Sequence, residues 1–184
     1  YTENDPTNPL SVYAKTKRQG ELNVLNHNPD AIVARVNFFG WSPSGNRSLA
    51  EFFFNNLSKK NPINGFVDIQ FCPLYVGFLS EILIEMVNKN LSGIYHVVSS
   101  DHFSKYQFGC EIAEVFGYDP TLIKPISVSQ SGLIAERSLN LTLSTKKIVT
   151  DLGHDIPTVR QGIERYYQDL QNGYSQKVKN FLKN

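Results

Sequence analysis

An apolar run in the first quarter of the chain limits the fold more than any other feature. Residues 31–39 read Ala-Ile-Val-Ala-Arg-Val-Asn-Phe-Phe, apolar at nearly every position instead of alternating. A strand that is buried on both faces of a parallel sheet has this pattern. The helix that contains Tyr13 is expected to begin at about Pro9, to run to about Asn26 and to end in the turn at 27–30. A helix followed directly by such a strand is half of a βαβ crossover, so the sequence predicts an α/β fold.

Helices and strands are expected to alternate along the rest of the chain. Helices are predicted at about 49–60, 77–88, 104–116, 144–152 and 158–171. Strands are predicted at 66–71 and 93–98, with an extended stretch at 139–143. The Asn, Pro and Gly of residues 61–65 predict a turn, and a polar tail follows Gly173. We expect 31–38 and 94–98 to lie parallel in one sheet, beside a smaller helical lobe.

Composition excludes several classes of protein. The chain has 184 residues of which 41% are hydrophobic, enough for about one domain with a real core. A formal net charge of +1 gives no electrostatic argument for binding nucleic acid or an anionic membrane. No apolar run approaches the roughly 20 residues that a membrane helix needs. Cys72 and Cys110 lack the spacing of a disulfide framework or a zinc site, so we expect no metal and a reducing, cytoplasmic setting.

The predicted first helix carries a pair of side chains that suits proton transfer. Asn8 is a plausible N-cap, and Pro9 fits the first helical position. Tyr13 and Lys17 are four residues apart, so they share one face of the helix. A cation beside a phenol favours the phenolate, which helps the group exchange a proton near neutral pH. On spacing alone, a half-buried Tyr beside a solvated Lys is the commoner explanation.

The residues around this pair resemble the catalytic segment of the extended short-chain dehydrogenase/reductase family. In that family an acidic-Pro loop and an Asn-Pro precede Tyr-x-x-x-Lys, and a Gly-Glu pair follows. Here these elements are Asp5-Pro6, Asn8-Pro9, Tyr13 with Lys17, and Gly20-Glu21. The resemblance implies that Tyr13 is the catalytic proton donor and acceptor. It also implies that Lys17 keeps Tyr13 acidic and binds the ribose of an NADPH or NADH cofactor.

Four later segments narrow the resemblance to the dTDP-4-dehydrorhamnose reductase group. These segments are residues 73–76, 93–97, 104–108 and 138–147. The order of elements fits the C-terminal half of those enzymes along almost the whole chain. The implied fold is the C-terminal part of a Rossmann-type doubly wound parallel sheet, joined to a small mixed α/β substrate lobe.

The resemblance also predicts how the chain is divided between two domains. Residues 1–42 would close the nucleotide-binding domain, and 43–184 would form mostly the substrate lobe, with 77–98 returning to the Rossmann-type sheet. No glycine-rich turn of the type that cradles a pyrophosphate follows a strand in this sequence. In the family this turn and the catalytic Ser or Thr lie upstream of Tyr-x-x-x-Lys. We therefore expect the N-terminal cofactor-binding half to be absent from this chain, which alone would have an incomplete cofactor site.

Five further positions are candidates for contacts with ligands. Asn37 and Phe38 end the apolar strand at its carboxyl edge, where ligands bind in doubly wound sheets. The resemblance implies that both contact the cofactor and that Asn37 also contacts substrate; the alternative is an ordinary strand end. Arg47 and Arg137 could clamp a diphosphate or make surface ion pairs. Tyr75 could line the sugar pocket or belong to the core.

The function implied by the resemblance is NAD(P)-dependent reduction of a nucleotide-linked 4-keto sugar. Hydride would pass from the dihydronicotinamide to the ketone carbon, and Tyr13 would protonate the developing alkoxide. An epimerase or dehydratase of the same family would use the same Tyr13 and Lys17. A non-catalytic, nucleotide-binding regulatory subunit is the alternative of a different class. The expected small-molecule partner is a nucleotide sugar, and a homodimer stays open as the assembly.

Overall fold

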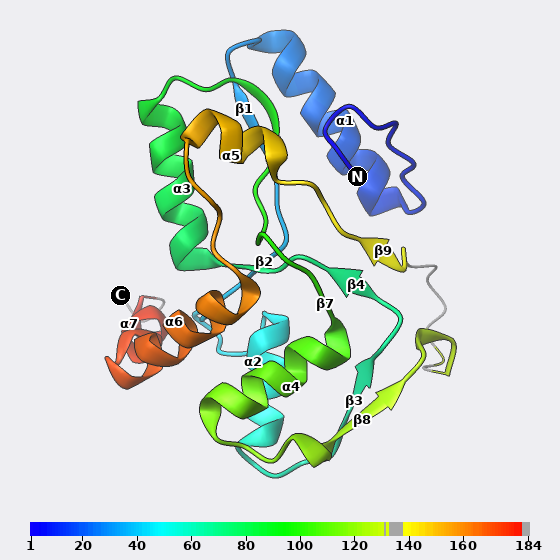
Figure 1. Cartoon of the computed structure of the whole chain (residues 1–184), viewed down its shortest axis with the longest axis vertical. Coiled ribbons are helices and arrows are strands. Elements are labelled where there is room, and N and C mark those ends of the chain that lie inside the picture. Colours follow the sequence, from blue (N-terminus) through cyan, green and yellow to red (C-terminus); the bar gives the residue numbers. More distant parts are fainter. Residues whose placement is uncertain (131, 133–137, 182–184) are drawn as a thin grey trace.

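The computed structural model of the chain shows a mixed α/β fold in which short parallel strand pairs alternate with helices (Figure 1). It describes residues 1–130, 132 and 138–181. The helices are α1 (Val12–His27), α2 (Leu49–Leu57), α3 (Val76–Asn88), α4 (Lys105–Phe116), α5 (Lys146–Leu152), α6 (Val159–Gln171) and α7 (Tyr174–Asn180). The strands are β1 (Ile32–Arg35), β2 (Phe38–Phe39), β3 (Ile63–Phe66), β4 (Gln70–Phe71), β5 (Leu74–Tyr75), β6 (Gly93–His96), β7 (Phe103–Ser104), β8 (Ile123–Ile126) and β9 (Asn140–Leu141). Two 3₁₀ turns cover Pro120–Leu122 and Val128–Gln130.

The predicted parallel pairing of the two main apolar segments is confirmed. β1 and β6 run parallel, in a register that pairs Ile32 with Gly93 and Arg35 with His96. α3 and α5 bury apolar side chains against this pair, including Met86 and Ile148, which are both 0% exposed. In Figure 1, α1 lies to one side of β1 and α3 to the other. The strand pair is thus the support on which α1 rests.

The run at 31–39 is not one strand, which corrects the expectation. β1 ends at Arg35, and after a two-residue break β2 pairs in parallel with β5. The carbonyl of Asn37, inside the break, accepts a hydrogen bond of 2.8 Å from the backbone N–H of Leu74. The chain therefore changes partner at Asn37, from β6 to β5. The residues of β1 are also half-buried instead of fully buried.

A second, aromatic core holds the helical lobe together. α2, α4 and α6 pack around the β2–β5 pair in the lower half of Figure 1. Phe108 is 0% exposed, and its ring centroid lies 5.1 Å from that of Phe39 and 5.4 Å from that of Phe71. Gly109 allows the close approach of α4 to α2, because a Cβ there would come within 2.3 Å of the Phe53 ring. Contacts between aromatic rings therefore hold the helices of this lobe together.

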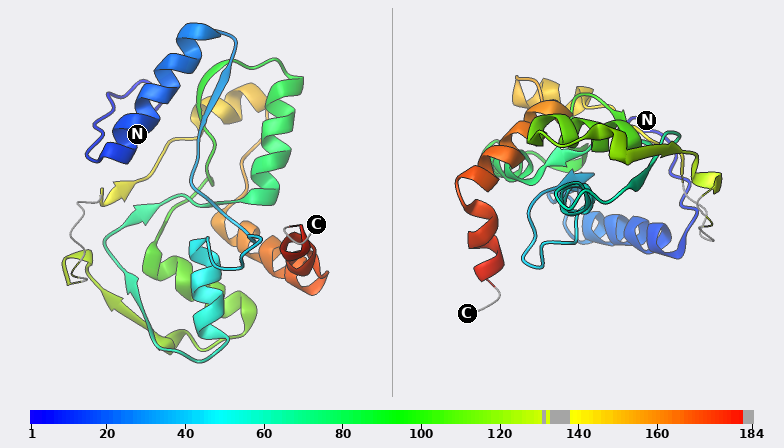
Figure 2. Two further views of the ribbon diagram at one scale, coloured as in Figure 1. Left: turned by 180° about the vertical axis from the view of Figure 1, so that it is seen from behind. Right: turned by 90° about the horizontal axis from the view of Figure 1, so that it is seen from below.

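Other boundaries differ from the sequence prediction. The predicted turn at 61–65 overlaps β3, which pairs in parallel with β8, a strand that the pattern did not indicate. The predicted strand at 66–71 is the end of β3 followed by the separate strand β4, which pairs with β7 and β9. The polar tail contains α7, which lies across the molecule from α1 in both views of Figure 2. The helix starts at Ser104 and Thr158 are confirmed, because each side chain caps its helix in a capping box.

Two further observations concern membrane spans and the cysteines. Within the described part of the chain, no helix is both long enough and apolar enough to cross a membrane. Cys72 is buried and Cys110 half-buried, and both are free thiols.

Candidate active site

The site is built around α1, which begins later than the sequence predicted. Ser11, not Asn8, is the N-cap, because its Oγ accepts a hydrogen bond of 3.1 Å from the backbone N–H of Ala14. A short hydroxyl side chain in this position satisfies one of the first free N–H groups of the helix. Asn8 and Pro9 therefore lie in the loop before α1 and not inside it.

Tyr13 and Lys17 lie together on the first turns of α1, as their spacing predicts. The Nζ atom of Lys17 is 6.0 Å from the centroid of the Tyr13 ring. The Tyr13 side chain is 71% exposed, so neither packing nor a buried partner holds it. The phenol and the ammonium are thus both free to meet a ligand.

Both side chains line a cavity of about 1060 Å³. Its wall combines the loop before α1, α1 itself, the end of β1 and residues on β6, α4 and β9. Asn37, which was predicted from its place at the strand end, lies on this wall with Tyr13 and Lys17. A cavity of this size can hold a ligand as large as a typical cofactor or drug.

The charged side chains on the wall favour an anionic ligand. Four are cationic and two are carboxylates, a formal balance of 4 − 2 = +2: Lys17, Arg18, Arg35 and Lys105 against Asp5 and Glu21. His96 also lines the cavity, and burial, the main cause, lowers its pKa, so the ring is neutral at pH 7. A concave site with excess positive charge concentrates anions.

The other predicted contact residues lie elsewhere. Phe38 is 61% exposed on β2, and Arg47 is exposed in the loop before α2; neither is among the described residues that line the cavity. Arg137 lies outside the described residues. The structure therefore brings together Tyr13, Lys17 and Asn37, but not Phe38 or Arg47.

Tyr75 is corrected from a pocket residue to a core residue. Its side chain is 1% exposed, and its ring packs between those of Phe39 and Tyr166. The Tyr75 hydroxyl donates a hydrogen bond to Oδ2 of Asp169 on α6. Burial, together with this carboxylate, raises the pKa of Tyr75, so the phenol stays protonated. Its role is to join β5 to α6.

Sequence reasoning missed an ion-pair network beneath α1. Arg35 donates from Nε to Oε1 of Glu21 at 2.8 Å and from Nη2 to Oε2 at 2.8 Å. Arg18 donates from Nη1 to Oε2 of the same carboxylate at 2.7 Å. The hydrogen bond from Arg35 is the main cause that lowers the pKa of Glu21. Arg35 is the one charged residue in the apolar run 31–39. A lone charge in such a strand indicates that it has a partner, and this was the feature of the sequence that could have predicted the network.

The network continues through His96 to the N-terminal segment. His96 is 1% exposed, and its Nε2 lies 3.5 Å from Nη1 of Arg35. The backbone N–H of His96 donates a hydrogen bond of 2.9 Å to Oε1 of Glu3. A line of charged and polar groups thus connects α1, β1, β6 and the first residues of the chain.

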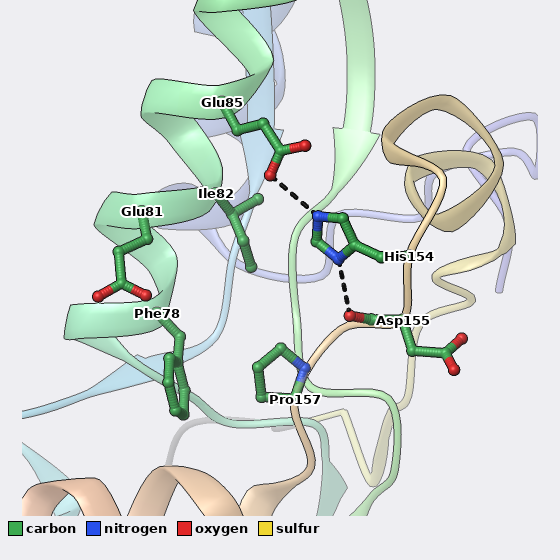
Figure 3. Close-up of a pocket in the computed structure, with 7 residues that line it drawn as sticks. All are labelled: Phe78, Glu81, Ile82, Glu85, His154, Asp155 and Pro157. Carbon is green, nitrogen blue, oxygen red and sulfur yellow. Dashed lines mark hydrogen bonds and ion pairs between the residues drawn. The ribbon is translucent and has the colours of Figure 1, made fainter.

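The second pocket has no feature that matches the predicted chemistry. It measures about 240 Å³ and lies between α3 and the turn after α5 (Figure 3). His154 and Glu85 face each other across it, with Nε2 2.9 Å from Oε2. None of the predicted site residues lines it, and no group of three or more His, Cys, Asp or Glu suitable for a metal occurs among the described residues. The larger cavity is therefore the candidate active site.

Comparison with known proteins decides the family. Residues 1–172 match the family model described as the RmlD substrate binding domain. The chain belongs to this family. The resemblance to extended reductases of the dTDP-4-dehydrorhamnose reductase type is thereby confirmed.

The chain is similar to two curated proteins with different names. The chain is 27% identical over 166 residues to the probable low-salt glycan biosynthesis reductase Agl14 of Haloferax volcanii, covering 89% of this chain and 55% of that protein. It is 28% identical over 158 residues to the methionine adenosyltransferase 2 subunit beta of Danio rerio, covering 80% of this chain and 48% of that protein. The chain spans about half the length of these relatives.

A solved structure confirms the fold class. The dTDP-4-dehydrorhamnose reductase of Bacillus anthracis, solved in complex with NADP, superposes with a TM-score of 0.83 at 20% sequence identity. The match covers 92% of this chain and 59% of that one. The predicted Rossmann-like mixed α/β fold with parallel strands is therefore correct.

Proposed function

We propose that the protein containing this chain is an NAD(P)-dependent reductase of a nucleotide-linked 4-keto sugar. The observation that carries the proposal is the cavity of about 1060 Å³ that Tyr13 and Lys17 of α1 line together with Asn37. Membership of the RmlD substrate-binding family and the likeness to a glycan biosynthesis reductase support it. The excess of cationic side chains on the cavity wall suits the diphosphate of such a substrate.

The residues present fit one part of a nicotinamide cofactor. The Lys17 ammonium and the Tyr13 hydroxyl are donors on the cavity wall, one helical turn apart, and they would hold the ribose. Asn37 would lie against the nicotinamide or the sugar. When bound, such a cofactor would supply the hydride for the ketone carbon.

The chain's own chemistry is proton transfer. The Tyr13 hydroxyl gives its proton to the ketone oxygen as negative charge develops there. The Lys17 ammonium then stabilises the charge left on the Tyr13 oxygen, because opposite charges attract strongly where a ligand excludes water. Tyr13 needs an exposed hydroxyl for this role, and its 71% exposure provides one.

The test is a pair of substitutions in the intact protein with a matched control. Tyr13→Phe removes the oxygen and keeps the ring, so turnover should fall by at least ~10²–10⁴-fold while cofactor affinity hardly changes. Lys17→Met should weaken both, since it removes a charge beside Tyr13 and a ribose contact. Lys15→Met, an exposed lysine of the same helix outside the cavity wall, should change neither.

Steady-state assays with NADPH and a nucleotide 4-keto sugar measure these effects. One NADPH oxidised for each sugar converted identifies a reductase, whereas an epimerase or dehydratase would return the cofactor unchanged. A Tyr13→Phe enzyme that reduces the sugar at the parent rate would remove Tyr13 from the mechanism and contradict the proposal.

A second candidate function is a non-catalytic regulatory subunit. The likeness to a methionine adenosyltransferase 2 subunit beta favours it. The chain is 28% identical to that subunit and 27% identical to the reductase relative, so sequence identity does not separate the two functions. In that case the intact protein would bind NADPH, but the parent and Tyr13→Phe proteins would show the same negligible turnover on every nucleotide 4-keto sugar tested.

A further inference from the structure

The face that α1 turns toward the rest of the protein is unusual for a long helix. None of its 16 residues, all of which the structure describes, is buried. The four that are half-buried, and so mark the inner face, are Ala14, Arg18, Glu21 and Leu25. Most surface helices are held by an apolar stripe. In α1 the middle of the inner face is instead charged, because it consists of Arg18 and Glu21.

The contact that ties this face to the sheet is a fork between Arg35 and Glu21. Two parallel N–H···O bonds of 2.8 Å join the guanidinium to the carboxylate, and both side chains are 17% exposed. A planar guanidinium that binds both carboxylate oxygens fixes direction as well as distance. Arg35 is itself set by the β1–β6 register, which places it opposite His96.

The fork lies close to the proposed chemistry without touching it. Glu21 follows Lys17 by one helical turn and Tyr13 by two, so the three side chains lie along one side of α1. All three line the same cavity. A roll of α1 about its axis would therefore break the fork and change how Tyr13 and Lys17 face the cavity at the same time.

We propose that the Glu21–Arg35 pair is a positioning device that sets the rotation of α1, and with it the place of Tyr13 and Lys17 in the cavity. The inference rests on the proposed reductase function for its catalytic consequence, but not for the anchoring itself. Glu21 and Arg35 are positioning residues, because they act through the helix and not on the reacting atoms. The bond from Arg18 to the same carboxylate holds Glu21 in the rotamer that the fork requires.

The experiment measures helix protection and catalysis on the same variants of the intact protein. Glu21→Gln keeps the shape of the side chain but removes the charge that binds the guanidinium. Hydrogen–deuterium exchange of the α1 amides should accelerate by roughly tenfold or more, since local opening of the helix becomes easier. The kcat for the nucleotide 4-keto sugar should fall by roughly 10–100-fold, because catalysis is sensitive to small misplacement. Its KM should not rise, because loss of the Glu21 charge makes the cavity wall more positive toward the diphosphate.

A second variant separates a directional contact from simple charge attraction. Arg35→Lys keeps a cation beside Glu21 but cannot form two parallel bonds. We expect it to reproduce the faster α1 exchange and the lower kcat of Glu21→Gln. An Arg35→Lys protein that behaves like the parent in both measurements would contradict the positioning role of the fork.

Glu111→Gln is the matched control. Glu111 on α4 is also 17% exposed and accepts a hydrogen bond of 2.5 Å from Arg160 on α6. The same chemical change there should leave α1 exchange and kcat at the parent values. The proposal is overturned if Glu21→Gln leaves α1 exchange unchanged, or if it accelerates exchange without lowering kcat in an active enzyme. If instead Tyr13→Phe shows that the reductase function is wrong, the exchange measurement still decides whether the fork anchors α1.

Discussion

α1 and the helical lobe are held by opposite means. The lobe buries a cluster of aromatic rings, among them Phe39, Phe53, Phe108 and Tyr166, each no more than 1% exposed. α1 buries no side chain and is tied to β1 by hydrogen-bonded charges. Ring packing stabilises the fold mainly by burying apolar area, whereas a guanidinium fork fixes direction at a modest gain in stability. The molecule thus keeps its stability in one region and the geometry of its proposed chemistry in another.

Deleting one aromatic ring in each region should give the largest difference in the free energy of unfolding. Phe108→Ala removes a fully buried ring, so the free energy of unfolding should fall by ~3–5 kcal/mol. Tyr13→Ala removes an exposed ring from a helix, and the change should stay within ~0.5 kcal/mol. Urea unfolding curves of the two variants measure both values. Equal losses would show that α1 is packed more firmly than its exposure indicates.

Two buried tyrosines of the aromatic core allow a hydroxyl with a hydrogen-bond partner to be compared with one that lacks it in the described part of the chain. The Tyr75 hydroxyl bonds to Asp169, whereas the Tyr166 hydroxyl has no hydrogen-bond partner among the described residues. Tyr75→Phe should therefore cost ~1–3 kcal/mol in unfolding free energy, because a mostly buried carboxylate loses its donor. Tyr166→Phe should be neutral or slightly stabilising, because it removes a buried polar atom without a partner.

The two substitutions delete the same atom from neighbouring rings, whose centroids are 6.0 Å apart, so each serves as the control for the other. Urea unfolding under identical conditions gives the difference directly. A larger loss at Tyr166 than at Tyr75 would mean that the Tyr166 hydroxyl is satisfied and that Asp169 does not depend on Tyr75.

Local patterns explain which parts of the fold were predictable. The parallel β1–β6 pair follows from two apolar segments, and the shared face of Tyr13 and Lys17 follows from a spacing of four. β3 was missed because its Asn and Gly indicate a turn. Its strand conformation depends on pairing with β8, whose partner residues lie 60 positions away, as Ile63 and Ile123 do. Long-range pairing overrides local preference there.

The site shows the same limit. The family resemblance led to Tyr13, Lys17 and Asn37, which share the cavity. It also led to Tyr75, whose burial against Asp169 depends on a helix 94 residues further along the chain. The Glu21–Arg35 fork was visible only as an acidic residue in a motif and a lone charge in an apolar strand. Nothing in the sequence alone joins those two residues.

The smallest expected effect concerns the exposed ion pair in the second pocket, which contrasts with the fork under α1. His154 and Glu85 are 49% and 34% exposed, and Nε2 lies 2.9 Å from Oε2 (Figure 3). The hydrogen bond to Glu85, and then that to the carbonyl of Asp155, raises the pKa of His154 above its ordinary value of 6.5. A raised folded-state pKa means that the pair stabilises the fold fully below pH 6.5 and that this contribution disappears as the pH rises through the higher folded value.

An exposed pair of this kind should contribute no more than ~0.5 kcal/mol, because water and salt screen it. An NMR titration of the His154 ring should give a midpoint above 6.5, and Glu85→Gln should lower that midpoint toward 6.5. The unfolding free energy of Glu85→Gln should fall below that of the parent by slightly more at pH 6 than at pH 9, where only the pair of Glu85 with Lys89, at 3.8 Å, remains to be lost. A His154 midpoint that does not move in Glu85→Gln would show that the pair is not formed in solution. A loss well above ~0.5 kcal/mol at pH 6 would show that this exposed pair is not screened as expected.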